Sequence, residues 1–219
     1  MSECVATAGC HQDKRGKRRA AMIEAAQQLF AEKGFDATTL GDIVGRSGGS
    51  LATLYDLFEN KTGLLRAMVC EKCGAIDDAL DRAVADHQPP SQVLRAIGEE
   101  MLSRLFAPAY VGMFRVVAAQ CAAQPDLGRQ LYDAGPAACQ AKGAEYLAAQ
   151  KAAGTLAVDD PLAASRLFFQ MVCGHYHSRL VFGLDVDLPA AERKRHLDYV
   201  VSAFLKIHRP EKRAAAAAT

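Results

Sequence analysis

Apolar residues recur at three- and four-residue intervals along most of the chain, and no stretch shows the two-residue alternation of a half-buried strand. In the first clear segment, over residues 17–33, one helical face carries Met22, Ile23, Ala26, Leu29 and Phe30. Gly34 ends this segment, because glycine adopts the left-handed conformation of a helix terminus without steric cost. The pattern predicts an all-α fold.

Two short helices joined by a glycine turn are predicted next. Thr38 is expected to cap a helix over residues 39–46, because its hydroxyl can accept a hydrogen bond from an unpaired amide. Gly48 and Gly49 break that helix, and Ser50 is expected to cap a second one over residues 51–58. Together with the preceding segment, this is the spacing of a helix-turn-helix head, whose second helix lies in the major groove of DNA.

The remainder predicts a larger helical body. A linking helix runs from Lys61 to about residue 87, and further helices are expected over residues 91–106, 109–123, 126–134, 136–153, 160–183 and 189–208. The expected organisation is therefore a disordered basic arm (1–16), a DNA-binding head (17–62), an effector-binding and dimerisation body (63–209) and a disordered tail (210–219).

The last two long helices are apolar over a broad arc, which favours burial against a partner subunit, although they could also only close the monomer core. The expected interface of a homodimer comprises Leu167, Tyr176, Leu180, Leu197, Val201 and Phe204.

Charge and composition narrow the class. The net charge of the 219 residues is only +1, so DNA binding must come from local placement of charge. Five cations between Lys14 and Arg19 form either a solvated arm or, in front of a DNA-reading head, a phosphate or minor-groove contact. The seven cysteines show no disulfide pattern and the chain has no signal segment, so we expect a cytoplasmic protein. No apolar run reaches about 18 residues, so no membrane span is predicted.

Over residues 17–66 the motifs closely resemble the N-terminal domain of TetR-family transcriptional repressors. The resemblance rests on the order Ala25-Ala26, Leu29-Phe30, Gly34-Phe35, Thr38-Thr39, Ile43-Val44, Gly48, Ser50, Thr53-Leu54-Tyr55, Phe58 and Lys61. The body is similar to the AefR-like branch at residues 114–115, 131–136, 154–156 and 159–161. Membership implies a homodimer that binds a double-stranded DNA operator and holds a ligand cavity in each body.

The resemblance also implies contacts with the DNA backbone, at Thr39, Ser50, Thr53, Tyr55 and Lys61. Hydroxyls, a helix N-terminus and a flexible ammonium suit phosphate. Tyr55 has the alternative of a partly buried aromatic of the head.

The base-reading positions depart from the family. Relatives often carry Lys at Leu51, Gly at Ala52 and His or Tyr at Leu57, and no Arg or Lys lies within residues 51–57 here. A bidentate arginine contact with guanine is therefore excluded on this helix. We expect thymine methyls to be read by Leu51, Ala52 or Thr53 and cytosine by Asp56, while affinity comes from Arg15, Lys17, Arg18 and Arg46.

A small, mostly apolar effector is expected in the body, with His175 as its polar partner. The expected lining is Met101, Leu105, Phe106, Phe114, Val117, Cys121, Tyr132, Phe168, Met171 and His175, although aromatic and methionine side chains at helical spacing are more often simply core.

Two cysteine groups leave an alternative input open. Cys70 with Cys73, or Cys173 with His177, could serve a metal or thiol sensor, but each is more simply core, and no metal or cofactor is predicted. No catalytic signature occurs, so an enzyme is not expected. The favoured function is a ligand-released repressor on a pseudo-palindromic operator; a small-molecule binding protein without operator reading is the more distant alternative.

Overall fold

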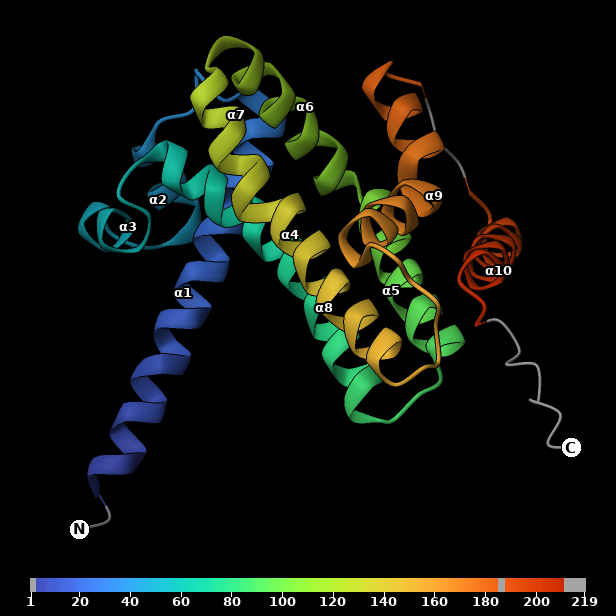
Figure 1. The fold of residues 1–219 in the computed structure, drawn as a ribbon. Coiled ribbons are helices and arrows are strands. Elements are labelled where there is room, and N and C mark those ends of the chain that lie inside the picture. The colour runs from blue at the N-terminus through green and yellow to red at the C-terminus, as the bar shows by residue number, and fades with distance from the viewer. Residues whose placement is uncertain (1–2, 185–187, 211–219) are drawn as a thin grey trace, which may run out of the picture. The chain divides into compact units, whose positions relative to one another are not determined.

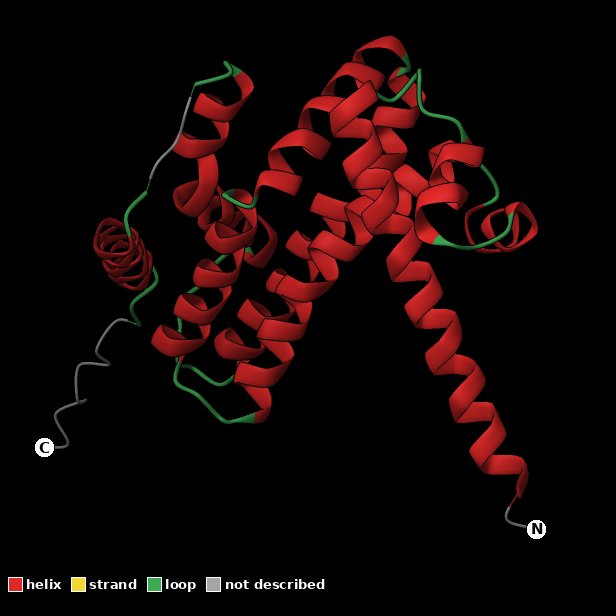
Figure 2. Ribbon diagram, turned by 180° about the vertical axis from the view of Figure 1, so that it is seen from behind, coloured by secondary structure: helices red, strands yellow, loops and turns green. Residues whose placement is uncertain are grey.

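The computed structural model describes residues 3–184 and 188–210, all of them helical or in short connections, with no strand among them (Figures 1 and 2). In chain order the elements are α1 (Glu3–Lys33), α2 (Leu40–Ser47), α3 (Leu51–Phe58), α4 (Lys61–Ala85), α5 (Pro90–Leu105), α6 (Pro108–Ala123), α7 (Pro125–Tyr132), a π-helical turn (Asp133–Ala137), α8 (Ala138–Ala152), α9 (Pro161–Val181) and α10 (Ala190–Ile207). The all-α prediction is confirmed. Except for Pro210, the tail predicted over 210–219 lies outside the described residues.

Prolines mark the start of four helices. Pro90, Pro108, Pro125 and Pro161 each begin a helix, where the missing amide donor has no partner to lose. Pro136 instead falls inside a continuing helix, and the backbone there widens into the π-helical turn.

Two helix starts differ from expectation. The first helix begins at Glu3 instead of near Lys17, since no proline interrupts the preceding residues. Thr39, not Thr38, caps α2. The Thr39 hydroxyl accepts a hydrogen bond from the Asp42 amide, and the Thr39 amide donates a hydrogen bond to the Asp42 carboxylate. Thr38 is buried and donates its hydroxyl to the carbonyl of Gly34 at 2.7 Å. The cap therefore lies one residue later than the sequence predicts, because Asp42 completes a capping box with Thr39 and not with Thr38.

The chain forms two compact units. Unit 1 contains the residues up to 71 together with Pro108–Ala134, so α6 and α7 join α1, α2, α3 and the first part of α4. Its buried core draws on all of these helices, through Met22, Ile23, Leu29, Phe30, Ile43, Leu54, Phe58, Leu64, Leu65, Met68, Met113, Leu127 and Leu131. The head thus shares its core with helices that the expected boundary at residue 62 assigned to the body.

Unit 2 contains Lys72–Ala107 and the residues from Gly135 onward. Helix α9 packs against α8, α5 and α10, and Phe168 of α9 meets Phe204 of α10 edge to face at 5.2 Å between ring centroids. Leu197 and Phe204 are almost fully buried here. Within the described residues no single helix is long and apolar enough to cross a membrane; α5 and α6 reach that length and composition only when counted together.

Candidate nucleic-acid interface

Helix α3 of unit 1 has one buried face and one bare face. Leu54 and Phe58 are inserted into the unit 1 core and fix the inner face. On the outer face Leu51 is 45% exposed and Tyr55 52% exposed, and Ala52 and Asp56 are exposed beside them. The outer face of α3 is therefore apolar except for one carboxylate and one phenol.

Side chains cap the start of both short helices. Ser50 accepts a hydrogen bond from the Thr53 amide at 3.1 Å, and the two hydroxyl oxygens lie 2.9 Å apart. Thr39 is exposed at the start of α2, where its hydroxyl donates to Asp42. The N-terminal ends of α2 and α3 therefore present hydroxyls and helix-dipole charge to solvent, a combination that suits phosphate oxygens.

Helix α1 holds the turn between α2 and α3. Gly48 adopts the left-handed conformation with φ of 69°, and the guanidinium of Arg18 donates to its carbonyl. A Cβ at Gly49 would lie 2.4 Å from the terminal methyl of Met22, a fully buried side chain. Met22 therefore fills the space that a larger residue at position 49 would take, and the two short helices are not left loosely packed.

Several of the expected DNA-contacting cations are paired with carboxylates in the DNA-free protein. Arg15 of α1 lies 3.1 Å from Asp56 of the reading helix, and Arg46 lies 2.7 Å from Glu32. The hydrogen bond from Arg46 lowers the pKa of Glu32. These exposed pairs are weak and screened by salt, so phosphate can compete for the arginines. Lys17 is exposed on the same helix as Arg15.

Lys61 is placed differently from the expectation of a phosphate contact. Its ammonium donates to the carbonyls of Phe35, Thr38 and Asp36 at 2.7, 3.0 and 3.3 Å and lies 4.5 Å from the centre of the Phe35 ring. An ammonium has three donors, and three carbonyls occupy them here. Lys61 thus ties the start of α4 to the connection between α1 and α2.

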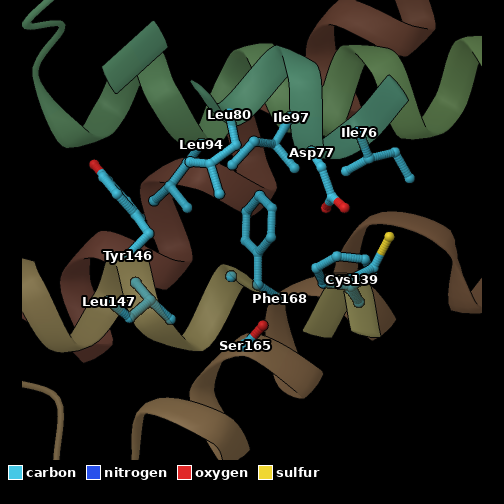
Figure 3. A pocket seen from close by; sticks show the side chains of 12 residues that line it. Ile76, Asp77, Leu80, Leu94, Ile97, Cys139, Tyr146, Leu147, Ser165 and Phe168 are labelled. Atoms are coloured by element: carbon cyan, nitrogen blue, oxygen red, sulfur yellow. The ribbon is translucent and has the colours of Figure 1, made fainter. Parts of the chain in front are cut away.

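Unit 2 encloses a narrow cavity between α4, α5, α8 and α9 (Figure 3). Its space is about 20 Å³, enough for about one water molecule. Asp77 and Cys139 lie at one end and Tyr146 and Leu147 at the other, with Phe168 between them. Its lining consists of Ile76, Asp77, Leu80, Leu94, Ile97, Cys139, Gly143, Tyr146, Leu147, Ser165, Phe168 and Phe169.

Two polar groups at this cavity are poorly solvated. Burial raises the pKa of Asp77, and it raises the pKa of Tyr146 to about 12. The Tyr146 hydroxyl is buried without a hydrogen-bond partner among the described residues. Ser165, by contrast, donates its hydroxyl to the carbonyl of Gln140 at 2.8 Å.

Most of the expected lining residues lie elsewhere, and Phe168 is the one that lines this cavity. Phe114, Val117, Cys121 and Tyr132 belong to unit 1, and Met101, Leu105, Phe106 and Met171 are core or half-buried residues of unit 2 outside the lining. His175 is exposed and faces Tyr176 at 5.3 Å between ring centroids, so it does not serve as the polar partner inside. Periodicity identified buried faces, but it carries no information on which helices enclose a common space.

The expected interface residues also need correction. Leu180, Leu197, Val201 and Phe204 are buried within the single chain, and Tyr176 is half-buried with Phe106 at 5.4 Å between ring centroids. Apolar side chains that stay exposed on α9 and α10 are Leu162, Leu167, Tyr199 and Ile207. Of the expected set, Leu167 is the exposed residue, with 43% of its surface accessible.

The two cysteine groups that the sequence suggested as sensors do not form metal or thiol sites in the way expected. Cys70 belongs to unit 1, where its thiol donates to the carbonyl of Ala134, whereas Cys73 belongs to unit 2 and meets Cys139. Burial raises the pKa of Cys173 to about 12 and lowers the pKa of His177. Among the described residues no group of three or more His, Cys, Asp or Glu side chains could hold a metal ion.

Comparison with known protein families matches both parts of the chain. Residues 92–210 match the description "AefR-like transcriptional repressor, C-terminal domain", and residues 22–68 match "Bacterial regulatory proteins, tetR family". The first match alone covers more than half of the 219 residues.

Individual relatives agree with these matches. The chain is 36% identical over 83 residues to the HTH-type transcriptional repressor ComR of Escherichia coli, an alignment that spans 36% of each protein. A TetR-family transcriptional regulator from Mesorhizobium loti has the same fold, with a TM-score of 0.73, 24% identity and coverage of 89% of this chain and 98% of that one. The flavonoid-responsive regulator FrrA gives a TM-score of 0.65 and 29% identity over 90% of this chain and 100% of its own.

Proposed function

We propose, on the premise that this chain belongs to the TetR family of bacterial transcriptional regulators as an AefR-like member, that it is a homodimeric repressor. It binds a pseudo-palindromic operator in the cytoplasm and releases the DNA when a small effector occupies unit 2. The family consists of regulators and not of enzymes.

One observation carries the DNA-binding part of the proposal. Helix α3 is capped at Ser50, anchored by Leu54 and Phe58, and bare at Leu51 and Tyr55. The apolar outer face of this eight-residue helix is not buried in the core of unit 1. Thymine methyls in the major groove are partners of matching chemistry.

Backbone contacts would come from groups that surround this helix. The hydroxyls of Thr39 and Ser50 stand at two helix N-termini, and Arg15, Lys17 and Arg46 lie exposed on α1 and α2. Such contacts supply affinity and register but not sequence preference. Arg18 and Lys61 mainly stabilise the structure of the head, because their side chains donate hydrogen bonds to backbone carbonyls of the protein.

The effector would enter the cavity lined by Asp77, Tyr146 and Phe168. With room for about one water molecule the cavity is closed in this structure, so an effector must favour a more open unit 2. The unpartnered Tyr146 hydroxyl offers it a hydrogen bond, and the apolar lining offers contact area. The response of FrrA, a structural relative, to flavonoids supports an aromatic effector.

Selection of bound duplexes from a random library tests the operator proposal. We expect an enriched palindrome whose half-sites are about one helical turn or more apart. Absence of any enriched palindrome would refute operator reading and leave a small-molecule binding protein as the explanation.

Two substitutions then separate the roles of the residues. Leu51→Ala should change the ranking among operator variants, because Leu51 would contact base edges. Lys17→Ala should weaken binding to every duplex and reduce the slope of log affinity against log salt concentration by about 1. Equal losses on every sequence for both variants would show that Leu51 does not read bases.

A further inference from the structure

Two cysteines of unit 2 that are far apart in sequence meet between α4 and α8. The Cys139 thiol donates a hydrogen bond to the carbonyl oxygen of Cys73 at 3.4 Å, so the two cysteines are in direct contact. Cys139 is 2% exposed, while Cys73 is half-buried and keeps contact with solvent. Asp77, one turn after Cys73 on α4, lies at the same end of the cavity as Cys139 (Figure 3).

We propose that Cys73 and Cys139 form an oxidisable dithiol site, at which a hydroperoxide converts the two thiols into a disulfide that joins α4 to α8. The site gives the protein a redox input in addition to its effector. Its regulatory consequence rests on the proposed repressor function, whereas the formation of the disulfide does not.

The surroundings divide the two roles between the cysteines. Cys73 keeps contact with solvent, where a hydroperoxide can reach it, whereas Cys139 is buried. Cys73 is therefore the attacking thiol, and Cys139 is the resolving thiol. The neighbouring Cys139 side chain lowers the pKa of Cys73, which agrees with this assignment.

The chemistry balances with a hydroperoxide as the oxidant. The Cys73 thiolate attacks the terminal oxygen and breaks the O–O bond; sulfenic acid forms on Cys73, and the departing alkoxide or hydroxide takes up a proton. The sulfur of Cys139 then attacks the sulfenic sulfur. Hydroxide leaves and combines with the thiol proton of Cys139, which Asp77 can relay, to give water and the disulfide. Two thiols are oxidised by two electrons, and one peroxide is reduced.

The disulfide would tie α4 to α8 by a covalent bond, with the two sulfurs about 2.05 Å apart. The same α4 carries Leu64, Leu65 and Met68 into the core of unit 1. Cys139 and Asp77 also line the cavity, so oxidation acts on the helix and on the wall that the effector would use. We expect the disulfide to lower operator affinity.

The other described cysteines lack such a partner. Cys70 directs its thiol to the Ala134 carbonyl, and Cys121 and Cys173 have raised pKa values caused by burial. The sequence suggested pairing Cys70 with Cys73, three residues apart on one helix; the structure joins Cys73 to α8 instead.

The experiment treats the reduced full-length protein with hydrogen peroxide and maps its peptides by mass spectrometry without reduction. We expect a dominant cross-link between the peptides of Cys73 and Cys139. Operator affinity should fall about tenfold and return with dithiothreitol. A dominant cross-link between other cysteines, sulfinic acid on Cys73 without a cross-link, or unmodified thiols would overturn the proposal.

Variants exclude indirect effects. Cys73→Ser should bind the operator like the reduced protein and lose the response to peroxide, whereas Cys70→Ser should keep it. Cys139→Ser should also lose the response, and mapping of the unsubstituted chain decides the question even if this buried variant folds poorly. A cross-link that leaves operator affinity unchanged would refute the regulatory role. Failure of the reduced protein to select any DNA would refute the repressor function instead.

Discussion

Asp56 places a carboxylate on the surface that we propose binds DNA. Arg15 lies 3.1 Å from it in the free protein, and both side chains are more than 60% exposed. If the carboxylate accepts a hydrogen bond from cytosine, its repulsion of DNA has a compensating contact at one base pair. If it does not, Asp56 and Arg15 simply restrain each other until DNA binds.

Asp56→Asn distinguishes these two roles. The second predicts about threefold tighter binding to every duplex and a salt slope steeper by about 1, because Arg15 becomes free for phosphate. The first predicts weaker binding only where the operator holds the cytosine. Fluorescence anisotropy at several salt concentrations measures both, and Asp78→Asn, an exposed site on α4, is the control for the change in net charge.

Gly63 meets a strict steric limit at the first turn of α4. A Cβ there would lie 1.9 Å from the carbonyl oxygen of Phe58, a backbone atom that cannot move aside alone. Gly63→Ala should therefore destabilise the protein by about 2 kcal/mol or more. Gly74→Ala on the same helix meets nothing within 4 Å and should stabilise by up to about 1 kcal/mol. Equal unfolding midpoints in urea for the two variants would contradict this account.

Among the elements, helix positions were readable from the sequence because proline, glycine and apolar spacing act locally. The bounds of α3, for example, depend on Ser50, on Leu54 and Phe58 four residues apart, and on the break after Phe58. The surface that α3 presents followed from the same pattern, since inner positions define outer ones.

Contacts between distant elements were not readable. A 3.6-residue period shows that Leu197 and Phe204 are buried, but not whether their neighbour is the same chain or a partner. Likewise Phe168 and His175 lie on one helix, yet only Phe168 faces the cavity. The pairing of Cys73 with Cys139 depends on how α8 packs, which no local pattern specifies.

The tie between α4 and the connection before α2 is testable at Lys61. Lys61→Met keeps the apolar stem over Phe35 but removes the donors to three carbonyls. The loss should reduce stability by about 1–3 kcal/mol, since partly buried carbonyls lose their partner. Thermal unfolding measures it. An unchanged melting temperature, together with a salt slope reduced by about 1, would instead support a direct phosphate contact.

For the whole molecule, assembly depends on what α9 and α10 leave exposed. Leu167 is 43% exposed and Tyr199 75% exposed, although Phe168 and Val200 beside them are buried. Apolar side chains in such positions favour a symmetric contact between two copies. In such a dimer, binding of one head to its half-site raises the effective concentration of the other head at the second half-site, which increases operator affinity.

Leu167→Arg should disrupt that contact. We expect sedimentation velocity to report a monomer, and operator affinity to fall by more than about tenfold because the second head no longer binds within the same complex. Val84→Arg introduces the same side chain at an exposed apolar position of α4 and should leave both properties unchanged. A dimer that survives Leu167→Arg would place the interface elsewhere.

The split composition of unit 1 limits how this regulator can be recombined. A chimera that joins residues 1–62 to a foreign sensor would discard Leu64, Leu65 and Met68, and with α6 and α7 also Met113 and Leu131. The donor sensor would then have to supply matching side chains from three helices. Designers of hybrid regulators should therefore take residues up to 71 and Pro108–Ala134 from one parent, with three crossover points in place of one.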